Sequence, residues 1–134
     1  MNRLFLDANV LFSAAYREES PLRRLWRQPR ADLVTSAYAL VEADRHLDAE
    51  QRRRLADLLE DVEIVPDVPA DDLPPGIALR NKDAPILAAA IAARATHLIT
   101  GDRRDFGVHY GERIGGVLVL PPRDSLESLP EQEA

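Results

Sequence analysis

The sequence contains no cysteine, which excludes a disulfide framework, a thiolate zinc site and a cysteine nucleophile, and which fits a reducing cytoplasm. No apolar run approaches the roughly 20 residues that a helix needs to cross a bilayer. The N-terminus has no basic stretch followed by a long apolar region, which is the pattern of a secretory signal. We therefore expect a soluble, cytoplasmic protein without a membrane partner.

Lysine is nearly absent, since all but one of the 17 basic residues are arginine. The net charge of −6 argues against a general nucleic-acid binder, because non-specific affinity arises mainly from cations that neutralise phosphates. Arginine, however, is the side chain best suited to bidentate phosphate contacts. An acidic protein with local arginine clusters is compatible with a metal-dependent nuclease, in which ions supply the missing positive charge, and equally with ordinary solvated helices.

The 134 residues, 46% hydrophobic and 30% charged, are enough for one globular domain and too few for two. We expect this domain to span residues 1–123, with a polar tail at residues 124–134. Short apolar runs alternate with helical patterns, which predicts an α/β sandwich with a largely parallel sheet and right-handed crossovers. The expected strands are residues 3–6, 32–36, 62–65, 97–100 and 117–120, and the expected helices are residues 10–15, 21–27, 37–47, 49–60 and 86–91.

Four acids stand where this topology would bring them to one end of the sheet. Asp7 ends the first strand and Asp102 follows the fourth, and open α/β sheets place ligands beyond the carboxyl ends of their strands. Asp83 precedes an Ala-rich helix, and Glu42 lies beside the apolar face of another. Each acid by itself can be explained without a metal, as a helix cap, a turn residue or a solvated side chain. Together they would repel one another unless cations lay among them, so the pattern predicts a metal site.

Magnesium or manganese is the metal that this ligand set favours. Carboxylate oxygens are hard ligands, and the chain has neither cysteine nor paired histidines that would favour zinc. We interpret His46, His97 and His109 as structural or surface residues. A carboxylate-bound ion with open water positions can generate hydroxide and hold a phosphate, which is the chemistry of in-line phosphodiester hydrolysis, often with two ions about 4 Å apart.

The segments that carry these acids resemble the PIN-domain nucleases. The matching parts are residues 5–11 (FLDANVL), Glu42 on its helix, residues 82–90 (KDAPILAAA) and residues 98–106 (LITGDRRDF). Each motif is short, but four in the right order and spacing, from residue 3 to about residue 122, are a specific signal. The resemblance is closest to small stand-alone members of the VapC-like kind, which are toxin components of type II toxin–antitoxin pairs.

This resemblance implies a parallel five-stranded sheet of order 3-2-1-4-5 and a Mg²⁺- or Mn²⁺-dependent endoribonuclease whose products carry a 5′-phosphate and a 3′-hydroxyl. It also implies an RNA substrate, a homodimer and a possible cognate antitoxin. Carried over by position, the implied metal ligands are Asp7, Glu42, Asp83 and Asp102, with Asp105 as an accessory, and the implied supporting residues are Asn9 and Thr100.

Two arginines follow Asp102 directly. Arg103 and Arg104 could steer the RNA backbone, although a solvated turn explains them nearly as well. The apolar residues of the helix expected at 21–27 are a candidate surface for a homodimer, namely Leu22, Leu25 and Trp26.

Two other functions remain open. Haloacid-dehalogenase-like phosphohydrolases also place an aspartate at a strand end, but they need a second aspartate two residues later as general acid, and here that position is Asn9. Alternatively, the protein is a catalytically inactive PIN-like binding module. The full set of acids argues against this, because a site without a metal has no need to hold mutually repelling carboxylates.

Overall fold

The computed structural model describes residues 1–80 and 82–128. Within these residues a six-stranded sheet has the order β3-β2-β1-β4-β6-β5, and every neighbouring pair is parallel except β5 and β6. The predicted α/β fold and its strand order are confirmed, the expected fifth strand being β6. The strands are β1 (Asn2–Leu6), β2 (Ala31–Ser36), β3 (Val62–Val65), β4 (His97–Ile99), β5 (Arg113–Ile114) and β6 (Val117–Leu120).

The short antiparallel strand β5 is an addition to the predicted sheet. It forms a hairpin with β6 through Gly115 and Gly116, which have φ values of 58° and 87°. Two consecutive positive φ angles are typical of the tight turns that join antiparallel strands. A Cβ on Gly115 would also lie 2.9 Å from Cδ1 of Ile91, so this glycine lets the hairpin pack against α4.

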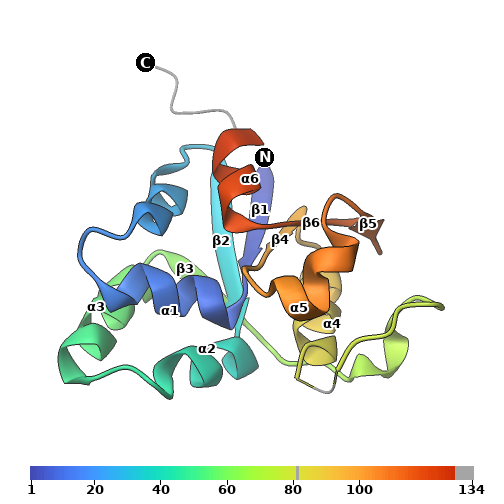
Figure 1. Cartoon of the computed structure of the whole chain (residues 1–134), viewed down its shortest axis with the longest axis horizontal. Helices are drawn as coiled ribbons and strands as arrows, with labels where there is room; N and C mark the ends of the chain where they lie inside the picture. The colour runs from blue at the N-terminus through green and yellow to red at the C-terminus, as the bar shows by residue number, and fades with distance from the viewer. Residues whose placement is uncertain (81, 129–134) are drawn as a thin grey trace.

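Helices cover both faces of the sheet (Figure 1). One face carries α1 (Ala8–Tyr16), the 3₁₀ helix η1 (Pro21–Arg27), α2 (Ala37–Asp44) and α3 (Ala49–Leu59). The opposite face carries α4 (Ala84–Ala92) and α5 (Arg103–Phe106). The remaining elements are η2 (Ala70–Asp72), η3 (Gly107–His109) and α6 (Pro122–Ser128). Among the described residues, no helix combines the length and the apolar character that crossing a membrane requires.

Strand β1 is the centre of the core. Leu4 and Leu6 pack into the cluster under α1 and α3, whereas Phe5 packs into the cluster under α4. All three side chains are fully buried, as expected for a parallel strand that is covered on both faces. Helix α4 is equally central, since residues 86–90 are all buried. The acids that flank β1 and α4 are therefore attached to the most rigid part of the protein.

The apolar side of η1 faces the protein's own core. Leu25 is buried, and Leu22 and Trp26 pack against the core cluster below α1. The indole Nε1 of Trp26 donates to the carbonyl of Leu58 at 2.9 Å. Leu22 and Trp26 are only partly buried, so the expectation that these residues offer a surface to a second copy stays a prediction.

Helix α6 crosses the boundary that we expected between the domain and its tail. It runs from Pro122 to Ser128, and Ser125 within it is buried. Residues 129–134 of the expected tail lie outside the described residues. The division of the chain at residue 123 stays a prediction.

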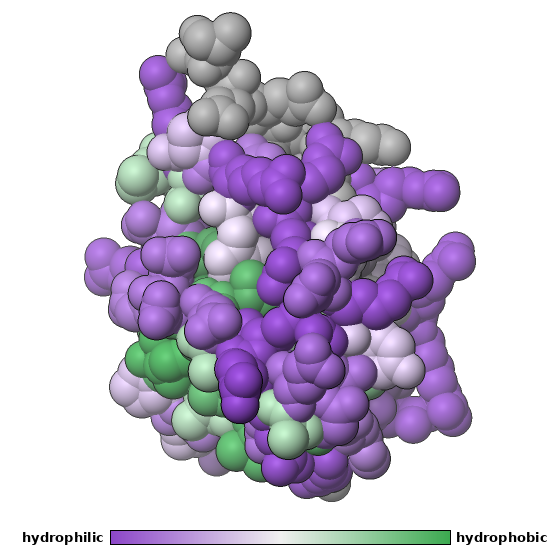
Figure 2. All heavy atoms as spheres, turned by 90° about the vertical axis from the view of Figure 1, so that its left-hand side faces the viewer, coloured by the Kyte–Doolittle hydropathy of each residue, from purple (hydrophilic) through white to green (hydrophobic). Residues whose placement is uncertain are grey.

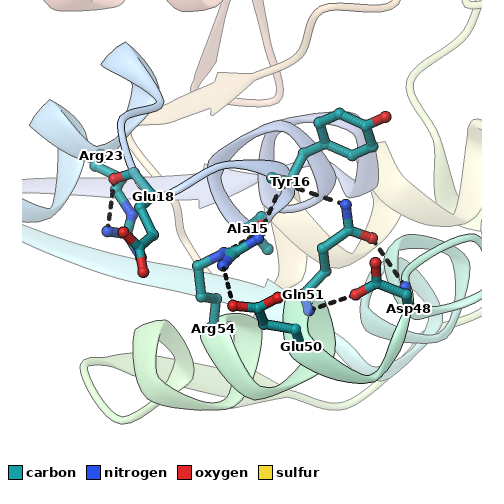
Figure 3. Close-up of polar contacts among 8 residues, drawn as sticks. All are labelled: Ala15, Tyr16, Glu18, Arg23, Asp48, Glu50, Gln51 and Arg54. Atoms are coloured by element: carbon teal, nitrogen blue, oxygen red, sulfur yellow. Dashed lines mark hydrogen bonds and ion pairs between the residues drawn. The ribbon is translucent and has the colours of Figure 1, made fainter.

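Side chains of α3 hold the carboxyl end of α1 (Figure 3). Arg54 donates from Nε to the carbonyl of Ala15 at 2.9 Å and from Nη2 to that of Tyr16 at 3.1 Å. Gln51 donates from Nε2 to the same Tyr16 carbonyl at 3.2 Å. The last carbonyls of a helix lack partners within it, and a cation there also interacts favourably with the helix dipole. This contact fixes α1, whose other end follows Asp7.

Replacing Arg54 with methionine is therefore expected to lower the free energy of unfolding by about 1–3 kcal/mol, because the charged hydrogen bonds to two carbonyls are lost while most of the packing stays. Urea unfolding measures the change. Arg53→Met is the matched control, since Arg53 is exposed on the same helix, and its effect should stay within about 0.5 kcal/mol. Equal effects of the two substitutions would contradict this role of Arg54.

The face formed by α1, α2 and α3 is mostly polar, with apolar surface exposed between the charged side chains (Figure 2). A groove of about 330 Å³ lies between α2 and α3 and is lined mainly by Leu40, Val41, Ala56 and Leu59. Val41 is 61% exposed. This groove is thus a more accessible apolar feature than η1.

Candidate metal centre

The middle of the sheet, where β1 and β4 pair in parallel, brings the candidate residues to one edge. The chain leaves β1 into α1 on one face, and it enters β4 from α4 on the other (Figure 1). A crevice forms beyond the carboxyl ends of the strands at such a switch point. Asp7 directly follows β1, and residues 100–102 directly follow β4. The backbone amide of Asp7 donates to the carbonyl of Ile99 at 3.0 Å, which ties the two strand ends together.

Asp7 is only 4% exposed and is held by three hydrogen bonds. Its Oδ1 accepts from the amide of Ala8 at 2.7 Å, so the side chain does cap α1. Its Oδ2 accepts from Thr100 Oγ1 at 2.7 Å and from Asn9 Nδ2 at 3.3 Å. Burial raises the pKa of Asp7, the hydrogen bonds oppose this rise, and the nearby charge of Asp102 adds to it. A cation at this position would reverse the penalty of burial.

The side chains of Asn9 and Thr100 connect Asp7 to the turn after β4. Asn9 Oδ1 accepts from the amide of Gly101 at 2.7 Å, and Thr100 Oγ1 accepts from the amide of Asp102 at 3.1 Å. A Cβ on Gly101 would lie 3.2 Å from Asn9 Oδ1, so glycine permits this close approach. The network fixes both strand ends relative to each other, which places Asp7 and Asp102 at one edge.

Asp83, Asp102 and Asp105 form a cluster in which one carboxylate oxygen of each lies within 4.8 Å of the others. Asp102 caps α5 by accepting from the amide of Asp105 at 3.1 Å. Asp83 stands at the N-cap position of α4, yet its side chain makes no capping hydrogen bond. It is 5% exposed, and its buried Oδ2 has no hydrogen-bond partner. Helix capping therefore explains in part why position 102 carries an aspartate. It does not explain the aspartate at position 83.

The carboxylates of this cluster perturb one another. Burial, followed by the contact with the Asp105 carboxyl and the charges of Asp102 and Asp105, raises the pKa of Asp83 to about 7. The same contact lowers the pKa of Asp105, and the nearby cations of Arg80 and Lys82 lower it further. Without a metal ion, a proton on Asp83 thus relieves the repulsion between the acids.

Asp105 lies within the cluster instead of at its margin. Its side chain is 7% exposed, and its buried Oδ2 has no hydrogen-bond partner. Arg80 Nε is 3.0 Å from its Oδ1, and Lys82 Nζ is 3.9 Å from its Oδ2. These two cations precede Asp83 in the sequence, so the segment that supplies one acid also neutralises another.

Glu42 lies on α2 and does not belong to the cluster of Asp83, Asp102 and Asp105. It lines a cavity of about 260 Å³ together with Asp7, Asp83 and Asp102. Its Oε1 forms an ion pair with Arg45 Nη2 at 3.2 Å. Four of the five acids thus face one cavity, and Asp105 joins Asp83 and Asp102 beside it.

A hard divalent cation fits these residues. The donors are carboxylate oxygens, which Mg²⁺ and Mn²⁺ prefer. The buried Oδ2 atoms of Asp83 and Asp105 lack hydrogen-bond partners. Nearly all buried polar atoms of folded proteins have such a partner. The raised pKa values of Asp7 and Asp83 report the same unmet demand for positive charge. Asp83, Asp102 and Asp105 could hold the ion, and Asp7 and Glu42 lie at the same cavity.

Several residues that surround the acids could not be recognised from the sequence pattern. Tyr38, His46 and Lys82 line the cavity, and His46, which the sequence predicts to be a structural or surface residue, is exposed. His46 follows Glu42 by four residues, which was a signal that it lies on the same side. Tyr110 donates from Oη to the carbonyl of Thr100 at 2.8 Å, and nothing local in the sequence indicated this contact. Arg103 and Arg104 are both exposed on α5, as a role in contacting RNA requires.

Comparison with known proteins agrees with this fold. A family model described as PIN domain matches residues 3–104. A chain of the crystal structure of VapBC2 from Rickettsia felis, bound to a DNA fragment from its promoter, superposes with a TM-score of 0.65. The match covers 89% of this chain and 98% of that chain at 17% sequence identity, so it shows a shared fold. No curated protein matches. Because the family model covers most of the chain, including Asp7, Glu42, Asp83 and Asp102, the protein belongs to the PIN domain family.

Proposed function

We propose that this protein is a Mg²⁺- or Mn²⁺-dependent endoribonuclease. The observation that carries the proposal is the cluster of Asp83, Asp102 and Asp105, with two buried carboxylate oxygens that lack hydrogen-bond partners. This cluster lies beside Asp7 at the crevice of a PIN domain. Acids in this arrangement suit the binding of a divalent cation, and phosphodiester hydrolysis is the reaction that such a centre serves best.

Each residue then has a defined task. Asp7, Glu42, Asp83, Asp102 and Asp105 provide the oxygen ligands. A bound ion would polarise the phosphate as a Lewis acid and lower the pKa of a water molecule.

The remaining polar residues position the acids and the substrate. Asn9 and Thr100 hold Asp7 through hydrogen bonds to its Oδ2. Arg103 and Arg104 contact the RNA backbone from the exposed side of α5. The similarity to the PIN-domain nucleases implies products with a 5′-phosphate and a 3′-hydroxyl.

The decisive test is cleavage of a structured RNA pool by the purified protein with Mg²⁺ or Mn²⁺ and with EDTA. We expect metal-dependent cutting that Asp7→Asn and Asp102→Asn each lower by about 10²–10³-fold, because each substitution removes a charge that holds the cation. Asp57→Asn, which changes an exposed acid on α3, should leave cleavage unchanged. Folding of all variants is compared by circular dichroism. If folded wild-type protein cuts no RNA with either metal, the proposal fails.

The same experiment separates the other two functions. A haloacid-dehalogenase-like phosphohydrolase would hydrolyse para-nitrophenyl phosphate, and an inactive module would bind metal without cleaving RNA. The geometry disfavours the first, because Asn9 occupies the position of the general acid and its amide is already bonded to Asp7 and Gly101. The unpartnered Oδ2 of Asp83, which lines the cavity of about 260 Å³, and that of the adjacent Asp105 favour a working centre over the second.

Protein partners are a second part of the proposal. The solved structure of similar fold is that of VapBC2, and this similarity supports the interpretation that this chain pairs with an antitoxin. An acidic protein of net charge −6 suits a partner with a basic segment near the acids. We also propose a homodimer, for which the groove between α2 and α3 is the better candidate surface. Light scattering after size exclusion, with Val41→Asp as the variant, tests it: a monomer in wild-type protein would contradict the dimer.

A further inference from the structure

A second cavity lies directly beside the acid centre. It has a volume of about 490 Å³ and is lined by Gly101, Arg103, Tyr110, Pro121, Arg123 and Asp124, among others. Asp102 lines the acid cavity, and its two chain neighbours Gly101 and Arg103 line this one. Since consecutive Cα atoms are about 3.8 Å apart, a single turn of chain separates the two cavities. A strand bound at the acids must pass next to it.

The chemistry of this second cavity complements that of the first. The acid centre repels phosphate, and only a cation placed there changes that. The second cavity instead carries the two guanidinium groups of Arg103 and Arg123, both exposed, against the single carboxylate of Asp124. Arginine binds phosphate bidentately, so this wall is suited to a phosphate that neighbours the reacting one.

An aromatic ring and prolines form the rest of the wall. Tyr110 Oη donates to the carbonyl of Thr100 at 2.8 Å, which fixes the ring relative to the strand that carries Asp102. Burial raises the pKa of Tyr110, and the charges of Asp102, Asp7 and Asp124 contribute, which places the ring within the electrostatic reach of both cavities. A rigid aromatic side chain next to arginines is the usual platform for an unpaired base.

We infer that this second cavity binds one unpaired nucleotide of a single-stranded RNA next to the scissile phosphate. Arg103 and Arg123 contact its phosphate, and Tyr110 stacks against its base. The inference rests on the proposed ribonuclease function and adds a substrate class to it. A base that is paired and stacked within a duplex cannot enter a cavity of about 490 Å³ by itself. The cavity therefore selects single strands and loops over duplexes.

Binding of a fluorescein-labelled single-stranded oligoribonucleotide, followed by anisotropy in EDTA so that the RNA stays intact, tests the inference. We expect Arg123→Ala to weaken binding at least about fivefold and to lower the slope of log K against log salt by about one. Asp124→Asn, which removes the negative charge of the carboxylate that lines this cavity, should tighten binding about twofold. A duplex of the same sequence should bind more weakly and respond little to either change.

The ring is tested by Tyr110→Leu against Tyr110→Phe. Loss of stacking should weaken binding at least about fivefold in the leucine variant, whereas the phenylalanine variant keeps the ring and should stay within about twofold of wild type. Arg53→Ala removes an exposed arginine of α3 and is the control for a general loss of charge. Melting temperatures of all variants control for folding.

The outcomes distinguish this inference from the proposed function. If RNA is cleaved but Arg123→Ala, Asp124→Asn and Tyr110→Leu all bind like wild type, the subsite is wrong and the nuclease stands. If the variants alter binding as expected but no metal gives cleavage, the subsite stands and the nuclease fails. Equal affinity for duplex and single strand, or no RNA binding by folded wild-type protein, overturns the inference.

Discussion

Asp83→Asn is expected to lower metal-dependent RNA cleavage by about two orders of magnitude or more while making the metal-free protein more stable above neutral pH. The two effects have one cause. Asp83 is buried beside Asp102 and Asp105 with an unpartnered oxygen, so its charge is unfavourable until a cation arrives. Asparagine has nearly the same shape and no charge. It therefore removes both the repulsion and the ligand.

The raised pKa of Asp83 determines whether the free energy of unfolding rises or falls with pH. An aspartate has an ordinary pKa of 3.8, whereas that of Asp83 in the folded protein is about 7. Between these values the folded protein keeps a proton that the unfolded chain has released, so the free energy of unfolding falls as the pH rises. This contribution to stability is fully present below about pH 4, decreases as the pH rises, and is lost above about pH 7. The lowered pKa of Asp105 acts in the opposite direction but below its ordinary value, outside this window.

Thermal unfolding in EDTA between pH 5 and pH 8 measures the effect. The melting temperature of the wild type relative to Asp83→Asn should fall steadily across this range, and Mn²⁺ should stabilise the wild type at pH 8 much more than the variant, because a ligand that binds only the folded state raises stability. Asp57→Asn serves again as the exposed control. Parallel curves for the wild type and Asp83→Asn would show that Asp83 is ionised without strain in the fold.

Phe106→Ala is expected to lower the free energy of unfolding by about 3–5 kcal/mol, which is a large part of the 5–15 kcal/mol typical of a domain. Phe106 is fully buried in the cluster that includes Phe5, Ile86 and Leu98. It ends α5, a helix of four residues that is too short to be stable by itself. The ring therefore anchors the turn that carries Asp102 and Asp105.

Urea unfolding and Mn²⁺ titration together measure this role. Phe106→Leu should retain much of the stability, because it fills most of the space. Val108→Ala is the matched control nearby, since Val108 is 79% exposed, and should change stability by less than about 0.5 kcal/mol. In Phe106→Ala we expect weaker Mn²⁺ binding even under conditions in which the protein remains folded. Unchanged Mn²⁺ affinity would show that the core does not position these acids.

The sequence by itself determined the strands and the acids at their ends. The apolar runs before Asp7 and Asp102 are local signals, and burial of residues 4–6 of β1 on both faces follows from their continuous apolar character. The order of helices and strands then permits few topologies, because parallel crossovers are right-handed. The placement of Asp7 near Asp102 was predictable for this reason.

Only the tertiary structure decided how the side chains divide their tasks. A local pattern describes Asp83 as a helix cap, but its carboxylate instead faces Asp105, and Arg80 and Lys82 lie beside that second acid. The contact of Tyr110 with Thr100 and the inward packing of Leu25 also depend on distant segments. Periodicity records which residues avoid water, because burial repeats with the geometry of each helix or strand. It does not record which polar groups meet, because that depends on how the elements pack in three dimensions.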